Sequence, residues 1–188
     1  METSNPITKE EHAIILDYLE HGYPFDDSGM KSSIAQALGV EHLSVMELIP
    51  KSDVHLQPHQ EVYIGEGKRI EIHHIKGKIS TDKLTSTAKH ELVHAIETVI
   101  GKDEKRFVEF FNKAQPLSMR MHQLELIPGF GKKHMWEVLE ARKVKPFESF
   151  DDLKERVKLL PDPKLAVAKR ILAELDGKEK YRLFTSGG

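Results

Sequence analysis

The sequence predicts an α+β protein, in which a small OB-like β-barrel domain with flanking helices precedes an all-α domain. Two observations lead to this class. Short β-branched runs interrupted by Gly and Pro recur between residues 33 and 80, which is typical of a small closed barrel. After residue 84 the apolar residues recur at helical spacing instead. The break Gln115-Pro116-Leu117-Ser118 separates the two patterns, so we expect domains at residues 1–116 and 117–188.

The barrel elements follow from turn residues and β-branched runs. Residues 1–10 are polar and expected to fray. The apolar run 13–19 is either a strand or part of a helix, because periodicity does not decide so short a run. A loop is expected at 21–29. Strand signals then cover residues 33–38, 43–49, 61–65 and 69–79, with turns at 56–60 and 66–68. An SH3-like barrel is the rival form.

Helical spacing predicts the remaining elements at residues 85–100, 105–114, 118–127, 132–143, 149–158 and 164–175. Ser86 is the expected cap of the first helix, and Gly101 its expected terminator. Trp136, Met119, Met121 and Met135 are expected to pack in the core, because large apolar side chains of small helical domains usually do. Stacking on a base is the alternative for Trp136. Residues 185–188 are expected to form a flexible tail.

Composition and charge restrict the class of protein. Cysteine is absent, which excludes disulfides, thiolate zinc sites and a cysteine nucleophile. No apolar run approaches the ~20 residues of a membrane span and no signal peptide is recognisable, so we expect a cytoplasmic protein without a membrane partner. The net charge is −2, but residues 1–50 carry 2 basic and 9 acidic side chains, whereas residues 117–188 carry 15 and 11. The C-terminal part therefore favours an anionic partner, with modest and salt-dependent affinity.

The most informative stretch is Ile127-Pro128-Gly129-Phe130-Gly131-Lys132-Lys133. Glycine adopts positive φ without steric cost and lets another backbone approach closely. A helix that opens after such a turn presents free N–H groups, which together with the helix dipole form an anion site. Lys132 and Lys133 add positive charge. This arrangement suits one phosphate of a nucleic-acid backbone and reads no base. We therefore expect nucleic-acid contacts from Pro128, Gly129, Phe130, Gly131, Lys132 and Lys133.

The same stretch resembles the hairpin of the helix-hairpin-helix family, and residues 146–153 look like the connector of its tandem members. The resemblance implies that DNA or RNA backbones are bound through N–H groups of the Gly-hydrophobic-Gly turn. The second hairpin, at residues 159–164, lacks both glycines and carries Asp162, so we expect it to serve packing only. A pure packing role also remains an alternative for the first hairpin. Arg142 and Lys143 either contact the adjacent phosphate or interact with the C-terminus of their own helix.

A second pattern, His90-Glu91-Leu92-Val93-His94, matches the His-Glu-x-x-His helix of zinc hydrolases. No third ligand follows at the spacing of the extended motif. We therefore expect His90 and His94 to be surface residues, with no resident metal, no cofactor and no catalytic residue. Adventitious metal binding and a zinc-dependent hydrolase are the alternatives. His73 and His74 are expected to point to opposite faces of a strand, one exposed and one half-buried.

Over residues 12–175 the chain resembles an uncharacterised archaeal family labelled putative nucleotide- or nucleic-acid-binding. The resemblance rests on residues 48–51, 62–65, 84–89, 106–116 and the Gly-rich hairpin. It implies an OB-like barrel followed by a tandem helix-hairpin-helix domain, and no known reaction. We therefore expect a non-enzymatic protein that binds RNA or DNA without sequence preference. A protein-interaction module of a ribonucleoprotein complex is the alternative.

Overall fold

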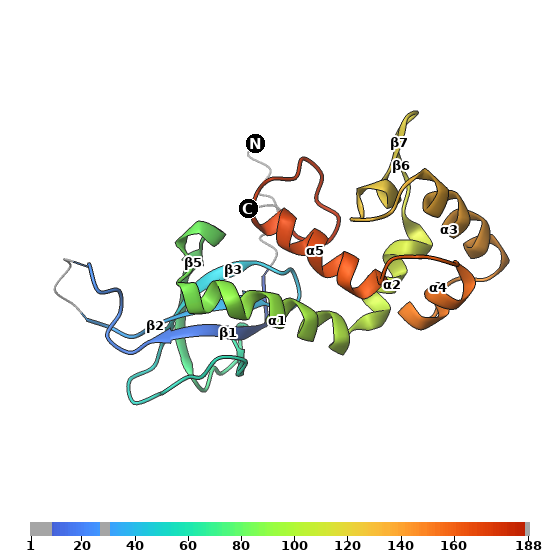
Figure 1. Ribbon diagram of the computed structural model, residues 1–188. Helices are drawn as coiled ribbons and strands as arrows, with labels where there is room; N and C mark the ends of the chain where they lie inside the picture. Colours follow the sequence, from blue (N-terminus) through green and yellow to red (C-terminus); the bar gives the residue numbers. More distant parts are fainter. Residues whose placement is uncertain (1–8, 27–30, 187–188) are drawn as a thin grey trace, which may run out of the picture. The chain divides into compact units, whose positions relative to one another are not determined.

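Figure 1 shows the computed structural model, which describes residues 9–26 and 31–186. The mixed α+β class is as predicted. The chain forms two compact units, Met1–Ala95 with Leu175–Gly188, and Ile96–Glu174. The expected boundary at residue 116 therefore lies inside the second unit. The chain enters this unit within the helix that contains residues 95 and 96, and leaves it near the end of the helix that contains residues 174 and 175. The expectations for residues 1–8, 27–30 and 187–188 lie outside the described residues.

The first unit is built on a five-stranded antiparallel sheet. Its strands are β1 (His12–Leu19), β2 (Ile34–Gly39), β3 (Val45–Pro50), β4 (Glu61–Tyr63) and β5 (Ile72–Lys78), in the order β4-β1-β2-β3-β5. The ambiguous run 13–19 is thus a strand. The sheet curls into a half-barrel with β4 and β5 as its edges. No ladder joins these two edges within residues 9–26 and 31–186, so the expected closed barrel is open here.

The central strands β1, β2 and β3 are largely buried on both faces, which explains their nearly continuous apolar sequences. One face forms a cluster with Ala13 and Ile15 of β1, Ala35 and Ala37 of β2, and Leu48 of β3. Alternate residues on the opposite face, such as those at positions 14, 16 and 38, are equally buried. The first turns of helix α1 (Ser86–Lys102) pass across β1 and β2 in Figure 1. The central strands of the sheet are therefore covered on both faces.

The start of α1 is tied to the sheet by Thr85, which replaces Ser86 as the expected cap. The Thr85 hydroxyl accepts a hydrogen bond from the Ala88 N–H at 3.0 Å and donates one to the Asp17 carboxylate at 2.6 Å. The Thr85 N–H donates to the side-chain oxygen of Gln36, which is fully buried in β2. A short 3₁₀ turn, η1 (Thr81–Lys83), leads into this junction. Gly101 does not end the helix, which continues to Lys102.

The second unit contains α2 (Glu104–Lys113), a small hairpin of β6 (Pro116–Ser118) and β7 (Met121–His122), the 3₁₀ helix η2 (Gln123–Leu126), α3 (Lys132–Val144), α4 (Phe150–Arg156) and most of α5 (Pro163–Leu175). The expected helix at 118–127 is wrong. Pro116 begins a β-hairpin instead. The 3₁₀ helix η2 that follows starts with a capping box. In it, the His122 side chain accepts a hydrogen bond from the Leu124 N–H at 3.1 Å, and the Glu125 carboxylate accepts one from the His122 N–H at 2.8 Å.

Several core expectations for the second unit need correction. Met135 is buried as expected, but Trp136 is 59% exposed, Met121 41% and Met119 fully so. Trp136 points outward because the buried face of α3 is carried by Met135 and Val138. Met119 and Met121 lie at the turn of the β6–β7 hairpin, which replaces the expected helix. The apolar character of these three side chains therefore did not predict their burial.

Two further expectations for the first unit are wrong. His73 and His74 are both exposed, and their Nδ1 atoms lie 2.8 Å apart. A β-bulge explains this, because Ile49 pairs with His74 while Pro50 pairs with Ile72, leaving His73 as an extra residue. At the C-terminal end, Thr185 is buried, so the described part of the expected flexible tail is packed. Among the helices of the described residues, none combines the length and apolar composition of a membrane crossing.

Candidate functional site

The Gly-rich hairpin is a tight turn between η2 and α3, and it is anchored by Phe130. The Phe130 N–H donates to the Ile127 carbonyl at 3.0 Å, and its side chain is only 4% exposed. Its ring lies 5.7 Å from that of Phe111, centroid to centroid. Phe130 was predicted to contact nucleic acid, but its side chain is committed to the core and is not available to a ligand. It fixes the position of the turn instead.

The two glycines of the turn have different physical roles. Gly129 has φ +83°, and a Cβ there would lie 3.0 Å from Cγ of Pro161 in the second hairpin. Gly129 is therefore required by the backbone and by close packing. Gly131 has φ −92°, and a Cβ there would meet nothing within 4 Å. Gly131 is therefore not required for a positive φ, and it leaves open space at the start of α3.

This open space is where α3 presents its first N–H groups. Gly131 is the N-cap, and it supplies no side-chain acceptor for them. The first N–H groups of any α-helix lack intrahelical partners, and they carry the positive end of the helix dipole. Pro128, Lys132 and Lys133 are exposed around the turn. Lys133 reaches Glu137 only at 3.9 Å, so its ammonium group remains largely available. The turn therefore presents N–H groups and two lysines to solvent.

The other two predicted contacts differ from each other. The Arg142 guanidinium donates from Nη1 to the carbonyls of Phe111 (3.1 Å) and Ala114 (3.0 Å), so it caps the end of α2. Burial lowers the pKa of Arg142 without neutralising it. Lys143 is 68% exposed and pairs with Glu140 at 2.6 Å. Of the two, only Lys143 has a side chain accessible to a ligand.

The second hairpin forms a structural corner between α4 and α5. Its Asp162 carboxylate accepts the Leu165 N–H at 3.0 Å and lies 3.8 Å from the Lys154 ammonium group, so it acts as the N-cap of α5. Pro161 packs against Gly129. Leu159 is 87% exposed and adopts a left-handed backbone conformation, with φ +58°. These contacts give the corner a packing role, and Asp162 does not face an anion site.

The His-Glu-x-x-His pattern does not assemble a metal centre. His90 and His94 are exposed on α1 with ring centroids 5.3 Å apart. The Glu91 carboxylate contacts Nε2 of His59, a residue of the turn before β4. Within the described residues no group of three or more His, Asp or Glu side chains is arranged to hold a metal ion. Glu91 is therefore a link between α1 and the 56–60 turn.

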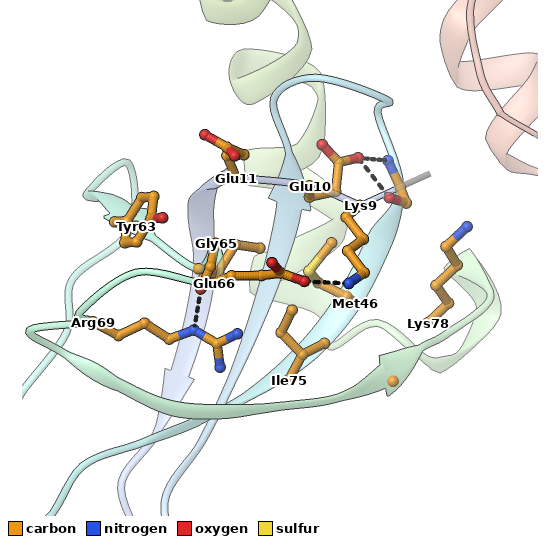
Figure 2. Close-up of a pocket in the computed structure, with 13 residues that line it drawn as sticks. Lys9, Glu10, Glu11, Met46, Tyr63, Gly65, Glu66, Arg69, Ile75 and Lys78 are labelled. Atoms are coloured by element: carbon orange, nitrogen blue, oxygen red, sulfur yellow. Dashed lines mark hydrogen bonds and ion pairs between the residues drawn. The ribbon is translucent and has the colours of Figure 1, made fainter. Parts of the chain in front are cut away.

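The half-barrel contains a separate cavity of about 580 Å³ between its edge strands, shown in Figure 2. Met46 and Ile64 are buried beneath it, and Ile75 of β5 borders it. Arg69 is held there by a hydrogen bond from its Nε to the Gly65 carbonyl at 2.8 Å.

Charges of both signs surround this cavity. Lys9 and Glu66 form an ion pair, and Lys78 and Glu11 lie farther along the rim. Mixed charge gives the rim no clear preference for an anion or a cation. The hairpin, with its open N–H groups and clustered lysines, therefore offers the more definite chemistry. Trp136, for which the sequence favoured a core position over stacking on a base, is exposed one helical turn after Lys132. Met135 and Val138 form the buried face of α3, and Trp136 lies outside that face.

Three comparisons place these features among known proteins. A family model described as "Protein of unknown function (DUF655)" matches residues 9–186. The chain is 43% identical over 183 residues to the uncharacterized protein MJ0038 of Methanocaldococcus jannaschii, covering 96% of this chain and 82% of that protein. It is also similar to the crystal structure of the family member Af1531 from Archaeoglobus fulgidus, with a TM-score of 0.86 and 39% identity over 94% of this chain and all of that one.

Proposed function

Since the chain belongs to the DUF655 family of proteins of unknown function, we propose its function from its own geometry: it binds the sugar-phosphate backbone of RNA or DNA without sequence preference and without catalysing a reaction. The contact surface is the turn formed by Pro128, Gly129 and Gly131 together with Lys132 and Lys133. One phosphate oxygen accepts the open N–H groups of α3, and the lysines neutralise its charge.

A single observation carries this proposal: Gly131 stands at the N-cap of α3 with no atom within 4 Å of the place where a Cβ would lie. Ser, Thr, Asp or Asn at this position would supply a side-chain acceptor for these N–H groups, and would stabilise the helix by a few tenths of a kcal/mol relative to Gly. Open space beside uncapped N–H groups and two exposed lysines suits an external anion instead.

Two finer features support the same reading. The short helices on either side of the hairpin, and the close contact of Gly129 with Pro161, are consistent with a tandem helix-hairpin-helix domain. The five antiparallel strands, with β1 paired to both β2 and β4, suit an OB-like barrel, which is five-stranded and often partly open. Fold likeness alone assigns no function, so both features only agree with the proposal.

The test is titration of the full chain with fluorescently labelled RNA, single-stranded DNA and duplex DNA of several unrelated sequences, at low and physiological salt. The expected result is binding at low salt that varies little among sequences and weakens steeply as salt rises, because each neutralised phosphate releases a counterion. Absence of binding to every polymer at low salt would overturn the proposal. Strong preference for one sequence would show base readout, which this turn does not provide.

A protein-interaction module of a ribonucleoprotein complex is a second candidate. One observation favours it: the β6–β7 turn presents Met119 and Met121, two exposed apolar side chains, on either side of Arg120. Exposed methionines are adaptable contact residues in protein interfaces. Co-purification of a protein partner that survives nuclease treatment, and that is lost in a variant with Met119→Ser and Met121→Ser, would favour this candidate over direct nucleic-acid binding.

A further inference from the structure

Trp136 stands apart from the other large aromatic residues of the second unit. Its side chain is 59% exposed. By contrast, the phenylalanines at positions 107, 111, 130, 147 and 150 are all at most 5% exposed. The core of the unit is thus completed without the indole, and an exposed Trp places a large apolar surface in water. An indole in this position has a flat face available to a ligand.

The position of Trp136 on α3 places it in line with the charges of the proposed site. At 100° per residue, Lys132 and Lys143 lie within about 40° of Trp136 around the helix axis. Along the axis Lys132 is about 6 Å before the indole and Lys143 about 10 Å after it. One exposed stripe of α3 therefore carries, in order, the open N–H groups, Lys132, Trp136, Glu140 and Lys143.

Glu140 in this stripe and Glu137 beside it offset only part of its positive charge. Glu137 lies 3.9 Å from the Lys133 ammonium group and 3.4 Å from Nδ1 of His134. Glu140 is paired with Lys143 at 2.6 Å, with both side chains about two-thirds exposed. Exposed ion pairs of this kind contribute little stability, so a phosphate that approaches can compete for the lysines.

We propose that Trp136 stacks on an unpaired nucleobase, so that the hairpin takes single-stranded or unpaired nucleic acid in preference to a duplex. This inference rests on the proposed function, because the hairpin supplies the phosphate contact beside the base. In a duplex the faces of the bases are covered by their neighbours, and an indole beside the backbone finds no free face. In a single strand every base has an accessible π-face, which makes stacking tolerant of sequence.

The experiment uses the fact that Trp136 is the only tryptophan of the chain. Its fluorescence is followed in the full-length protein during titration with oligo(dT), oligo(U) and a duplex, while labelled versions of the same polymers report binding by anisotropy. We expect the single strands to quench the indole emission to saturation, and the duplex to bind without quenching it.

Variants then connect the signal to affinity. Trp136→Ala is expected to weaken single-strand binding about tenfold or more, the range found for aromatic platforms, and to leave duplex binding unchanged. Trp136→Phe is expected to restore part of the loss, because it retains an aromatic face. Ile70→Ala is the matched control, since Ile70 is 73% exposed but lies in the other unit. Circular dichroism verifies that each variant is folded.

The outcomes separate this inference from the proposed function. Suppose that the wild-type protein binds every polymer without quenching of its indole emission, and that Trp136→Ala binds single strands as tightly as the wild type. The stacking inference is then wrong and the proposed function stands. If single-strand and duplex binding fall equally in Trp136→Ala, the indole contacts the backbone and the inference is again wrong. If no polymer binds the wild-type protein, the proposed function fails, and the stacking role fails with it.

Discussion

Glu10 and Glu41 cap each other's backbone. The Glu10 carboxylate accepts hydrogen bonds from the N–H groups of Glu41 (2.8 Å) and His42 (2.9 Å), and also bonds Ser44. The Glu41 carboxylate accepts from the N–H groups that follow Glu10, those of Glu11 (3.0 Å) and His12 (3.1 Å). This reciprocal pair fastens the start of β1 to the β2–β3 turn. It also explains why Glu10, expected to fray, is only 5% exposed.

The pair predicts an acid-dependent stability. Burial alone would raise the pKa of Glu41, but hydrogen bonds from the His12 ring and the two N–H groups lower it from 4.5 to about 2. A carboxyl with a lowered folded pKa stabilises the fold above the unfolded pKa, and this contribution is lost as pH falls from about 4.5 to about 2. Glu41→Gln mimics the protonated state. We expect it to cost about 1–2 kcal/mol at pH 7.

Urea denaturation at several pH values measures this effect. The difference in stability between wild type and Glu41→Gln is expected to be largest near neutral pH and to shrink below pH about 4.5. Glu20→Gln is the control, because Glu20 is exposed and lies beyond the end of β1. A constant difference at all pH values would show that Glu41 acts through packing and not through its charge.

The second prediction concerns the two glycines of the hairpin. Gly129→Val should destabilise the protein by about 1–3 kcal/mol, because a β-branched residue resists φ +83° and its Cβ would press on Pro161. Gly131→Val should cost less, about 1 kcal/mol for the poorer N-cap, since φ is −92° and the space is open, yet weaken nucleic-acid binding at least tenfold by blocking the approach to α3. Thermal unfolding and anisotropy titration measure the two effects. A folded Gly131→Val variant with full affinity would contradict the assigned role.

The third prediction concerns charge at the turn. Replacing Lys132 and Lys133 together by Ala should weaken binding to all sequences alike and reduce the salt dependence by up to about two phosphate contacts. The matched control removes the same charge from the other unit, by Lys68→Ala with Lys83→Ala. The slope of log Kd against log salt is the measured quantity. Equal losses in both double variants would mean that net charge matters and the turn does not.

The sequence was informative where local chemistry decides the structure. Turn residues and β-branched runs located β2, β3, β4 and β5 approximately but left the run that forms β1 open between strand and helix, and the glycines placed the hairpin before α3. The predicted family of unknown function with archaeal relatives is confirmed. The α+β class is also confirmed.

Other features depend on residues distant in the sequence. The capping of β1 by Glu41 joins positions 30 residues apart, so the fraying predicted for Glu10 was wrong. Trp136 was assigned to the core by residue type, although the phenylalanines had already filled it. Arg142 was expected either to contact a phosphate or to interact with the C-terminus of its own helix, whereas the fold brings it to the carbonyls at the end of α2. Pairings of this kind leave no periodic signal in the chain.

The last prediction concerns the corner between α4 and α5. Leu153, Val157, Val167 and Ile171 are all at most 2% exposed, as expected for side chains that pack within the helical unit. Leu153→Ala should therefore destabilise the protein by about 2–5 kcal/mol, through lost burial and the cavity left behind. Leu165→Ala, at a position 47% exposed on α5, is the control and should cost much less. Denaturant unfolding compares the two.

Asp162 at the same corner separates stability from binding. Its carboxylate caps α5, so Asp162→Ala should cost about 1 kcal/mol, a larger effect than its exposed position suggests. Asp162→Asn should keep most of the stability, because an amide oxygen still accepts the Leu165 N–H. Neither variant should weaken nucleic-acid binding, since Pro161 and Pro163 have no N–H groups to offer a phosphate. A large loss of affinity in folded Asp162→Asn would show that this corner contacts the ligand directly.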